Sequence, residues 1–215
     1  MRVKFCGITR ADDAEEAARL GAWAIGLNHW PESPRRCDSA VAAEIAGALR
    51  RRLEVVGVFV NASLDDVTRA AEDESLTMLQ LHGDEGPAFC QEAARRTGLR
   101  VIKAMRVRSA ADVQAAEAYR TEYHLLDAHR PGIPGGTGES FNWDLAGSRR
   151  PGVPMILAGG LNAANVAEAI AVGHPFAVDV ASGVESEPGV KDPALMAEFV
   201  ERARAATADP WVVAR

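Results

Sequence analysis

The chain has 215 residues, with 24 Lys and Arg against 30 Asp and Glu, and its net charge of −6 disfavours a nucleic-acid partner, which would usually require a basic surplus. The three cysteines form no CxxC pair, which disfavours a disulfide framework and predicts reduced thiols in the cytoplasm. No apolar run reaches the roughly 18 residues that a membrane span needs, so we expect no membrane partner either.

Short apolar, β-branched runs alternate with Ala-, Glu- and Arg-rich amphipathic runs along the chain. Such alternation predicts βαβ units and a parallel sheet. The expected strands are 2–6, 23–28, 54–60, 77–81, 100–105, 123–128, 153–158 and 176–181. The expected helices are 11–20, 38–50, 63–73, 86–97, 109–118, 162–172 and 192–206, with a shorter helical turn near 142–147.

The spacing of the expected strand ends distinguishes two parallel architectures. Eight ends recur at regular steps of about 22 to 32 residues, which fits a (β/α)8 barrel (TIM barrel) of the α/β class better than a doubly wound sheet of about five or six strands. No linker or composition break interrupts the pattern, so residues 1–215 are predicted to form one barrel domain. The expected strand ends are Cys6, Asn28, Val60, His82, Met105, Asp127, Ala158 and Ala181.

Active sites of such barrels lie at the carboxyl ends of the strands, which makes Cys6 and Asp127 candidate catalytic residues. Asp127 could cap the following loop, or it could donate a proton if the barrel mouth desolvates it. Cys6 could be a small buried hydrophobe or a reactive thiolate, and the sequence leaves both open. Cys37 and Cys90 fall at or within expected helices and are interpreted as structural.

The loops after strands seven and eight are a frequent phosphate site in barrels. Gly159 and Gly160 allow the backbone to approach a ligand, and Ser182 and Gly183 offer a hydroxyl and further N–H donors. Asn162 is expected to cap the next helix and to leave free N–H groups at its start. The Gly-rich stretch 129–140 is too long for an ordinary connection and predicts a functional loop or lid.

The histidines lack the close helical spacing of a metal pair, so no metal is expected. His82 ends a strand and could hydrogen-bond a ligand, while His124 and His174 are interpreted as structural. A mononuclear metal site built from His29 and His82 is the alternative.

Taken together, these strand-end segments resemble the phosphoribosylanthranilate isomerase family of tryptophan biosynthesis. They follow the family order over nearly the whole chain. The matching segments are Lys4-Phe5-Cys6-Gly7-Ile8-Thr9, Ser33-Pro34-Arg35, Val56-Gly57-Val58-Phe59-Val60-Asn61, Gln80-Leu81-His82-Gly83, Leu126-Asp127-Ala128, Gly135-Gly136-Thr137-Gly138, Leu157-Ala158-Gly159-Gly160-Leu161, Asp179-Val180-Ala181-Ser182-Gly183-Val184-Glu185 and Pro188-Gly189-Val190-Lys191-Asp192.

The resemblance implies an Amadori rearrangement of N-(5-phosphoribosyl)anthranilate without a metal or organic cofactor. Asp127 would be the general acid that opens the furanose ring, and Cys6, as thiolate, the general base that removes the C2′ proton. Arg35 would pair with the anthranilate carboxylate, although the adjacent Arg36 could take that place.

The resemblance also implies further contacts around the substrate. His82 and Asp179 would bind the substrate, the loops after strands seven and eight would hold its phosphate, and 129–140 would close over it. The only partner expected is this small phosphorylated molecule, with the chain acting as a monomer or homodimer.

The chain departs from the family at Asn28 and His29, where aromatic or apolar residues are common, and at Ala181, which is often Ser. One alternative is the histidine-pathway isomerase, which uses two aspartates. It is disfavoured because Cys6 stands at the end of strand one and because Val60-Asn61-Ala62-Ser63 offers no second Gly-rich phosphate turn. A non-catalytic barrel that binds a phosphometabolite would need the phosphate loops but neither Cys6 nor Asp127.

Overall fold

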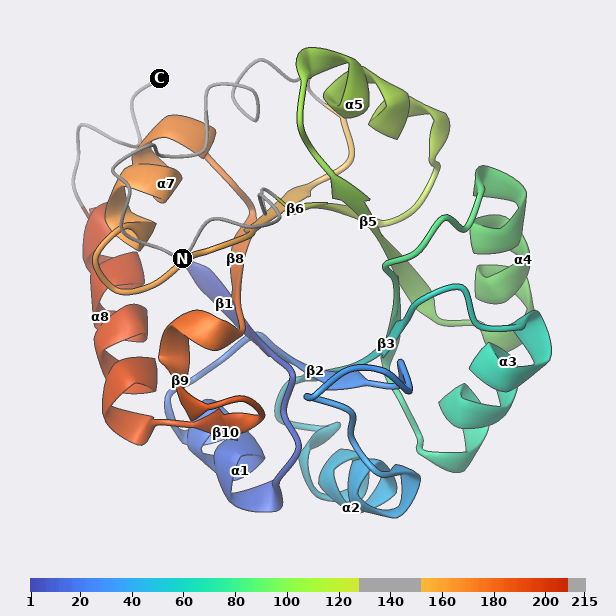
Figure 1. Ribbon diagram of the computed structural model, residues 1–215, viewed down its shortest axis with the longest axis horizontal. Helices are drawn as coiled ribbons and strands as arrows, with labels where there is room; N and C mark the ends of the chain where they lie inside the picture. Colours follow the sequence, from blue (N-terminus) through green and yellow to red (C-terminus); the bar gives the residue numbers. More distant parts are fainter. Residues whose placement is uncertain (128–151, 209–215) are drawn as a thin grey trace.

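The computed structural model describes residues 1–127 and 152–208. Eight parallel strands close into a barrel in chain order, and the helices surround it (Figure 1). This confirms the predicted α/β barrel class. The strands are β1 (Arg2–Cys6), β2 (Ala24–Asn28), β3 (Glu54–Phe59), β4 (Met78–Leu81), β5 (Arg100–Arg106), β6 (Tyr123–Asp127), β7 (Met155–Ala158) and β8 (Ala177–Val180).

The helices agree with the amphipathic runs to within a few residues at most ends. The α-helices are α1 (Ala11–Arg19), α2 (Ser39–Leu49), α3 (Leu64–Asp73), α4 (Pro87–Thr97), α5 (Ala110–Ala115), α7 (Val166–Gly173) and α8 (Pro193–Ala208). Two 3-10 turns accompany them, η1 (Ala116–Ala118) and η2 (Ser182–Val184). The predicted turn near 142–147 and loop 129–140 lie outside the described residues.

Two predicted helices differ from the structure. The run 109–118 is α-helical only to Ala115 and ends in the 3-10 turn η1. The helix expected from 162 begins at Val166, because two asparagine side chains hold a separate turn before it. Asn162 Oδ1 accepts from the Ala164 N–H, and Asn165 Oδ1 accepts from the Asn162 N–H, both at 2.8 Å. Asn165, and not Asn162, is the N-cap residue.

A short antiparallel pair, β9 (Glu185–Glu187) and β10 (Val190–Lys191), follows β8 and was not predicted. It lies beside β1 and α1 at the rim of the barrel (Figure 1). Gly189, at a φ of 86°, makes the turn between the two strands, since a left-handed backbone suits a residue without a Cβ. The pair places Glu185 and Lys191 next to the end of β1, as the contacts below show.

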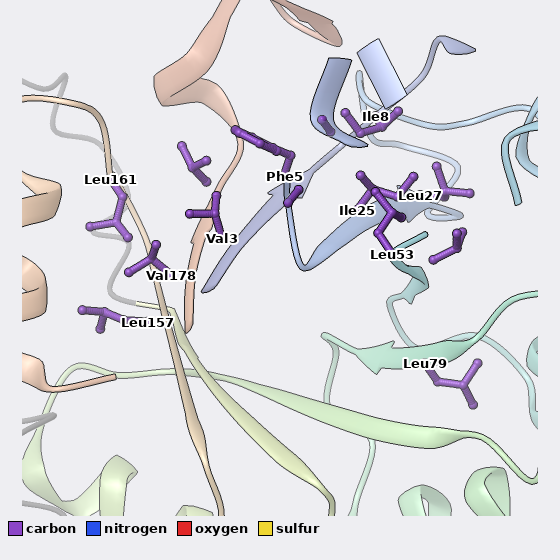
Figure 2. Packing of buried hydrophobic residues seen from close by; sticks show 14 of the residues in the cluster. Val3, Phe5, Ile8, Ile25, Leu27, Leu53, Leu79, Leu157, Leu161 and Val178 are labelled. Carbon is purple, nitrogen blue, oxygen red and sulfur yellow. The ribbon is translucent and has the colours of Figure 1, made fainter. Parts of the chain in front are cut away.

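The core has two layers, because successive strand residues point alternately outward and inward. The outward side chains pack against the helices, and Figure 2 shows this layer from β1, β2, β4, β7 and β8, with Phe5, Leu79 and Val178 among its members. The inward layer is a separate cluster of buried apolar residues, including Ala24, Ile102, Leu125, Ile156 and Ala177.

The same alternation turns polar residues of the strands inward. Lys4 and Cys6 share one face of β1, and Gln80 and His82 share one face at β4 and just beyond it. Lys4 and Gln80 are fully buried. The barrel therefore carries polar side chains near the carboxyl ends of its strands, above an apolar interior. Among the described residues, no helix is both long and apolar enough to span a membrane.

Candidate active site

Cys6 is the last residue of β1 and is half-buried at the barrel rim. Gly26 faces it from β2, where the register pairs the two residues. A Cβ at Gly26 would lie 2.9 Å from Cys6 Sγ and 3.1 Å from Lys4 Nζ. A side chain at this position would therefore collide with both groups, so Gly26 creates the space in which the thiol and the ammonium lie close together.

The environment of the thiol contains opposing electrostatic effects. Burial raises the pKa of Cys6 above its usual value, and the carboxylate of Asp179 acts in the same direction. The positive charges of Lys4 and Lys191 and a hydrogen bond from Lys4 oppose this rise. The two lysines thus supply the positive charge that a reactive thiolate requires.

Lys4 is itself held by a buried ion pair. Its Nζ donates to Asp179 Oδ1 at 2.9 Å, with both side chains nearly or fully inaccessible to solvent. Burial alone would lower the pKa of Lys4, but Asp179 and Cys6 outweigh it and the pKa is raised, so Lys4 is a cation. Asp179, predicted to bind substrate, therefore has one carboxylate oxygen engaged by a lysine.

Lys191 connects three segments at the rim near Cys6. Its Nζ donates to the Cys6 carbonyl oxygen at 2.6 Å, to the Ala181 carbonyl oxygen at 3.1 Å and to Glu185 Oε1 at 2.8 Å. These bonds join the ends of β1 and β8 to the β9–β10 pair. The backbone that carries Cys6 is thus fixed by a buried lysine from far along the chain.

Arg35 lies on the same side of the site. Its Nε donates to Glu185 Oε1 at 2.8 Å and its Nη2 to Glu185 Oε2 at 2.6 Å. Burial opposes the ionisation of Glu185, but hydrogen bonds from Arg35 and Lys191 outweigh it and lower the pKa of its carboxyl. The Arg35 side chain crosses Gly7, where a Cβ would lie 2.7 Å from its Cδ. Glu185 holds one edge of the guanidinium and orients the rest.

Arg36 points elsewhere. It lines a cavity of about 630 Å³ between the loops after β2 and β3 and helix α3, together with His29 and Asp73. Arg35 and Arg36 thus face different parts of the molecule, and only Arg35 lies beside the residues around Cys6. This favours Arg35 over Arg36 as the partner of a substrate carboxylate.

Asn28 shapes the loop that carries Arg35. Its Oδ1 accepts from the Trp30 N–H at 2.9 Å, and its Nδ2 donates to Ser33 Oγ at 3.0 Å. Ser33 Oγ in turn accepts from the Arg35 N–H at 3.1 Å. His29 instead stacks on Phe59, with ring centroids 4.6 Å apart.

The second candidate, Asp127, ends β6 at the same rim of the barrel as Cys6. His82 Nε2 lies 3.2 Å from Asp127 Oδ2, and Gln80 Nε2 lies 2.8 Å from His82 Nδ1. The three side chains form a line from the barrel interior to the rim. Asp127 also has an interaction partner beyond these residues.

The glycines predicted to bind phosphate occupy adjoining loops. Gly159 and Gly160 have φ of 93° and 65°, which suits residues without a Cβ. A Cβ on Gly183 would overlap the carbonyl oxygen of Leu161, so the loops after β7 and β8 touch there. The two loops are thereby brought together, with Ser182 exposed on the second of them.

Several of the N–H groups expected to be free at Asn162 are already bonded. The Asn162 and Ala164 N–H groups are bonded to side chains of their own turn, and the Val166 N–H is bonded to the Asn162 carbonyl oxygen. These bonded groups are not available to an anion at this rim, which leaves the two glycine loops as its main source of donors. The prediction for Asn162 is wrong because the asparagines satisfy the donors locally.

The remaining candidates have structural surroundings. Cys37 and Cys90 are buried, and burial raises the pKa of each thiol to about 11. His124 is buried with Nε2 2.9 Å from the Tyr119 carbonyl oxygen, and His174 ends α7 in a left-handed conformation. In the described part of the chain, no group of three or more His, Cys, Asp or Glu side chains is placed to hold a metal ion.

The sequence interpretation did not single out Lys4, Gln80, Glu185 or Lys191. A signal was present for the first two, because each stands two residues before a selected strand-end residue and so shares its face. Glu185 and Lys191 contact Arg35 and Cys6 across 150 and 185 residues, a separation at which local pattern carries no information.

Comparison with known proteins yields consistent matches over the whole barrel. The sequence model of the N-(5′-phosphoribosyl)anthranilate (PRA) isomerase family matches residues 3–202. The N-(5′-phosphoribosyl)anthranilate isomerase of Geotalea uraniireducens is 48% identical over 203 residues, covering 94% of this chain and 98% of the relative. The enzyme of Acidithiobacillus ferrooxidans is 48% identical over 210 residues, covering 95% and 98%.

Solved structures show the same similarity. The phosphoribosyl anthranilate isomerase of Thermotoga maritima superimposes with a TM-score of 0.86 and 39% identity, covering 95% of this chain and 99% of that one. Another such isomerase structure, a complex with reduced 1-(o-carboxyphenylamino)-1-deoxyribulose 5-phosphate, has a TM-score of 0.83 and 37% identity, with coverage of 95% and 99%.

Proposed function

The chain belongs to the N-(5′-phosphoribosyl)anthranilate isomerase family, and we propose that Cys6 and Asp127 are the general base and general acid of its reaction. The enzyme catalyses the Amadori rearrangement of N-(5′-phosphoribosyl)anthranilate to 1-(2-carboxyphenylamino)-1-deoxyribulose 5-phosphate in tryptophan biosynthesis. The observation that carries the proposal is the position of the two residues at the ends of β1 and β6, on one rim of the barrel.

The reaction needs one group that donates a proton and one that accepts a proton. Asp127 gives its proton to the furanose ring oxygen, the bond from that oxygen to C1′ breaks, and a Schiff base forms. The Cys6 thiolate removes the C2′ proton and leaves an enolamine. When C1′ takes up a proton and the 2′-hydroxyl loses one, the ketone forms and both side chains return to their starting states.

The surroundings of Cys6 support its role as the base. Burial opposes the formation of the thiolate. The positive charges of Lys4 and Lys191 next to Sγ counter this effect. Lys191 also fixes the Cys6 backbone through its carbonyl oxygen. Cys37 and Cys90 lack comparable positions, since both are buried and neither ends a strand of the barrel.

Arg35 is proposed to bind the anthranilate carboxylate. Glu185 occupies its Nε–Nη2 edge, and the planar guanidinium retains further N–H donors that suit a carboxylate. Asn28 and Ser33 support this arrangement because they hold the loop on which Arg35 stands. Asp179 is proposed to contact the sugar through the carboxylate oxygen that Lys4 leaves free.

The phosphate is proposed to bind at Gly159, Gly160, Ser182 and Gly183. The contact between the loops after β7 and β8 supports this, because it gathers N–H donors and one hydroxyl at a single place. A related isomerase structure holds a reduced phosphorylated ligand.

We also propose that residues 1–215 act as one catalytic domain in the cytoplasm, as a monomer or homodimer. Dimeric forms are described for the Thermotoga maritima relative.

The test is a steady-state assay that follows the loss of substrate fluorescence, with phosphoribosylanthranilate generated in situ. We expect Cys6→Ser and Asp127→Asn each to lower kcat by about 10²-fold or more, the typical contribution of a general acid or base. Cys90→Ala and Asp84→Asn are matched controls on a buried thiol and an exposed carboxylate. Near wild-type turnover in either variant of Cys6 or Asp127 would remove that residue from the mechanism.

A further inference from the structure

Two side chains, Gln80 and His82, connect the interior of the barrel to the proposed acid, Asp127. Gln80 is fully buried on β4, His82 follows that strand, and Asp127 ends β6. Gln80 Nε2 lies 2.8 Å from His82 Nδ1, and His82 Nε2 lies 3.2 Å from Asp127 Oδ2. Both ring nitrogens of His82 are thus engaged by side chains of the protein.

The chemistry of these contacts determines where the imidazole carries its proton. A reversed Gln80 amide would place Oε1 against the ring and require a proton on His82 Nδ1. With the amide nitrogen of Gln80 facing the ring, His82 Nδ1 accepts and carries no proton. A neutral imidazole then has its hydrogen on Nε2. His82 is therefore arranged to donate to Asp127 Oδ2.

Gln80 also makes an unfavourable contribution to folding stability, because one of its polar atoms is buried and unpaired. Its Oε1 is the only buried side-chain nitrogen or oxygen atom without a hydrogen-bond partner among residues 1–127 and 152–208. Most buried polar groups are satisfied, because an unpaired one loses its hydration without compensation. An apolar side chain of similar size would avoid this cost but would lose the hydrogen bond to His82 Nδ1, so the glutamine keeps that bond at the expense of an unpaired buried oxygen.

We propose that Gln80 is a positioning residue of the reaction, which acts on Asp127 by fixing the proton of His82 on Nε2. With His82 N–H bonded to Oδ2, the proton that Asp127 transfers resides on Oδ1. When that proton passes to the ring oxygen, the same N–H stabilises the carboxylate that remains, and His82 keeps its own proton throughout. The inference rests on the proposed role of Asp127 and reinterprets His82, which the resemblance assigns to substrate binding.

The first test reads the tautomer of His82 directly. Long-range proton–nitrogen NMR spectra of the ¹⁵N-histidine-labelled protein distinguish protonated from unprotonated ring nitrogens, and a His82→Asn variant identifies the His82 signals among the five histidines. We expect His82 to be protonated on Nε2 only. In Gln80→Glu the new carboxylate should draw a proton onto Nδ1. A wild-type His82 protonated on Nδ1 would overturn the inference without any measurement of activity.

The second test separates positioning from binding and from stability. Gln80→Met keeps the volume and removes both the donor and the unpaired oxygen. We expect kcat to fall about 10- to 100-fold, as for a misplaced catalytic group, with KM nearly unchanged and an unfolding temperature no lower than wild type. Gln91→Met, on the exposed face of α4, is the matched control and should leave kcat unchanged.

Three outcomes oppose the inference. An unchanged kcat in Gln80→Met removes the positioning role, and a raised KM with unchanged kcat returns His82 to substrate binding. A lower unfolding temperature with normal kcat makes Gln80 structural.

If Gln80→Met does not fold, Gln80→Asn takes its place. This variant keeps the amide but withdraws it by one methylene. Full activity of Asp127→Asn would overturn the proposed function itself, whereas an inactive Asp127→Asn with a normal Gln80→Met overturns only this inference.

Discussion

Lys4 Nζ lies 2.9 Å from Asp179 Oδ1 inside the barrel, two residues before Cys6 on the same face of β1. Buried ion pairs are often no more stabilising than apolar residues of the same volume. The pair lies next to Cys6, so its role is better explained by its effect on the Cys6 thiol than by a gain in stability. Asp179 holds the ammonium group where it can also interact with the Cys6 thiol, whose ionisation burial opposes.

The first prediction concerns the pH dependence of Lys4→Met. Burial already raises the pKa of Cys6, and Lys4 counters that rise, so removal of the cation should raise the pKa further. The thiolate is the active form of the base, and a higher pKa leaves less of it at neutral pH. We therefore expect kcat/KM at neutral pH to fall and the rising limb of its pH profile to move to higher pH.

A second buried lysine provides the control. Lys103 pairs with Glu85 at 2.8 Å and is equally buried, but it lies on β5 and bonds to the β4 loop, away from Cys6. Loss of either lysine should lower stability by about 3 to 5 kcal/mol, because an unpaired carboxylate remains buried. Only Lys4→Met should move the pH profile. If both variants or neither move it, Lys4 has no specific effect on the thiol.

The second prediction concerns chemical modification of the three cysteines. Cys37 and Cys90 are buried, and their pKa values of about 11 keep them as thiols at mildly alkaline pH. Burial raises the pKa of Cys6 as well, but Cys6 is only half-buried at the rim, so a reagent can reach its thiol, and two lysines lie nearby. Iodoacetamide should therefore label Cys6 first in the native protein and abolish activity in parallel.

Peptide mass spectrometry identifies the labelled thiol. Cys6→Ser should take up no label over the period that inactivates the wild type, and inorganic phosphate or the reaction product should slow the labelling. Labelling of Cys37 or Cys90 before Cys6, or full activity after modification of Cys6, contradicts the assignment. In the urea-unfolded chain, where burial no longer matters, all three thiols should react.

The sequence predicted the barrel because its signals are local and repeated. Strand and helix periodicity recurs eight times, so an error of a few residues at one end does not alter the count. The rule that barrel sites lie at the carboxyl ends of strands then selected Cys6, His82 and Asp127. The same period of two could have selected Lys4 and Gln80, which share faces with Cys6 and His82.

Other features depend on contacts that no local pattern contains. The position of Glu185 against Arg35 joins residues 150 apart and relies on the β9–β10 pair, whose two short strands carry too few residues for a clear signal. The start of α7 was misplaced because Asn162 fits an N-cap by type, while the second asparagine, Asn165, forms a turn first. The preference of N-caps for asparagine identified the residue type, but it could not decide between Asn162 and Asn165.

The third prediction concerns Arg35 and its orientation by Glu185. Arg35→Lys removes the fork that bonds to both Glu185 oxygens and presents donors to a carboxylate. Charge-assisted hydrogen bonds are worth about 1.5 to 3 kcal/mol, so KM should rise about tenfold or more. Glu185→Gln should raise KM in the same direction, because Arg35 loses its ionic partner but keeps its charge.

Arg36→Lys is the control for Arg35→Lys. It changes the neighbouring guanidinium, which lines the cavity by α3, and should leave KM unchanged. Steady-state kinetics on the three variants separate the two arginines. A raised KM in Arg36→Lys with a normal KM in Arg35→Lys would exchange their assignments.

The last prediction concerns the contact between the two phosphate loops. A methyl group on Gly183 would overlap the Leu161 carbonyl oxygen, so Gly183→Ala must push the loop after β8 away from the loop after β7. The N–H donors of the two loops would then no longer converge. We expect a higher KM for the substrate and weaker inhibition by inorganic phosphate, together with a lower unfolding temperature.

Gly47→Ala is the control, because Gly47 lies within α2 with open space around it. It should stabilise the protein by about 0.5 to 1 kcal/mol and leave both KM and the inhibition constant of phosphate unchanged. Wild-type phosphate inhibition in Gly183→Ala would show that the anion binds elsewhere on the barrel rim.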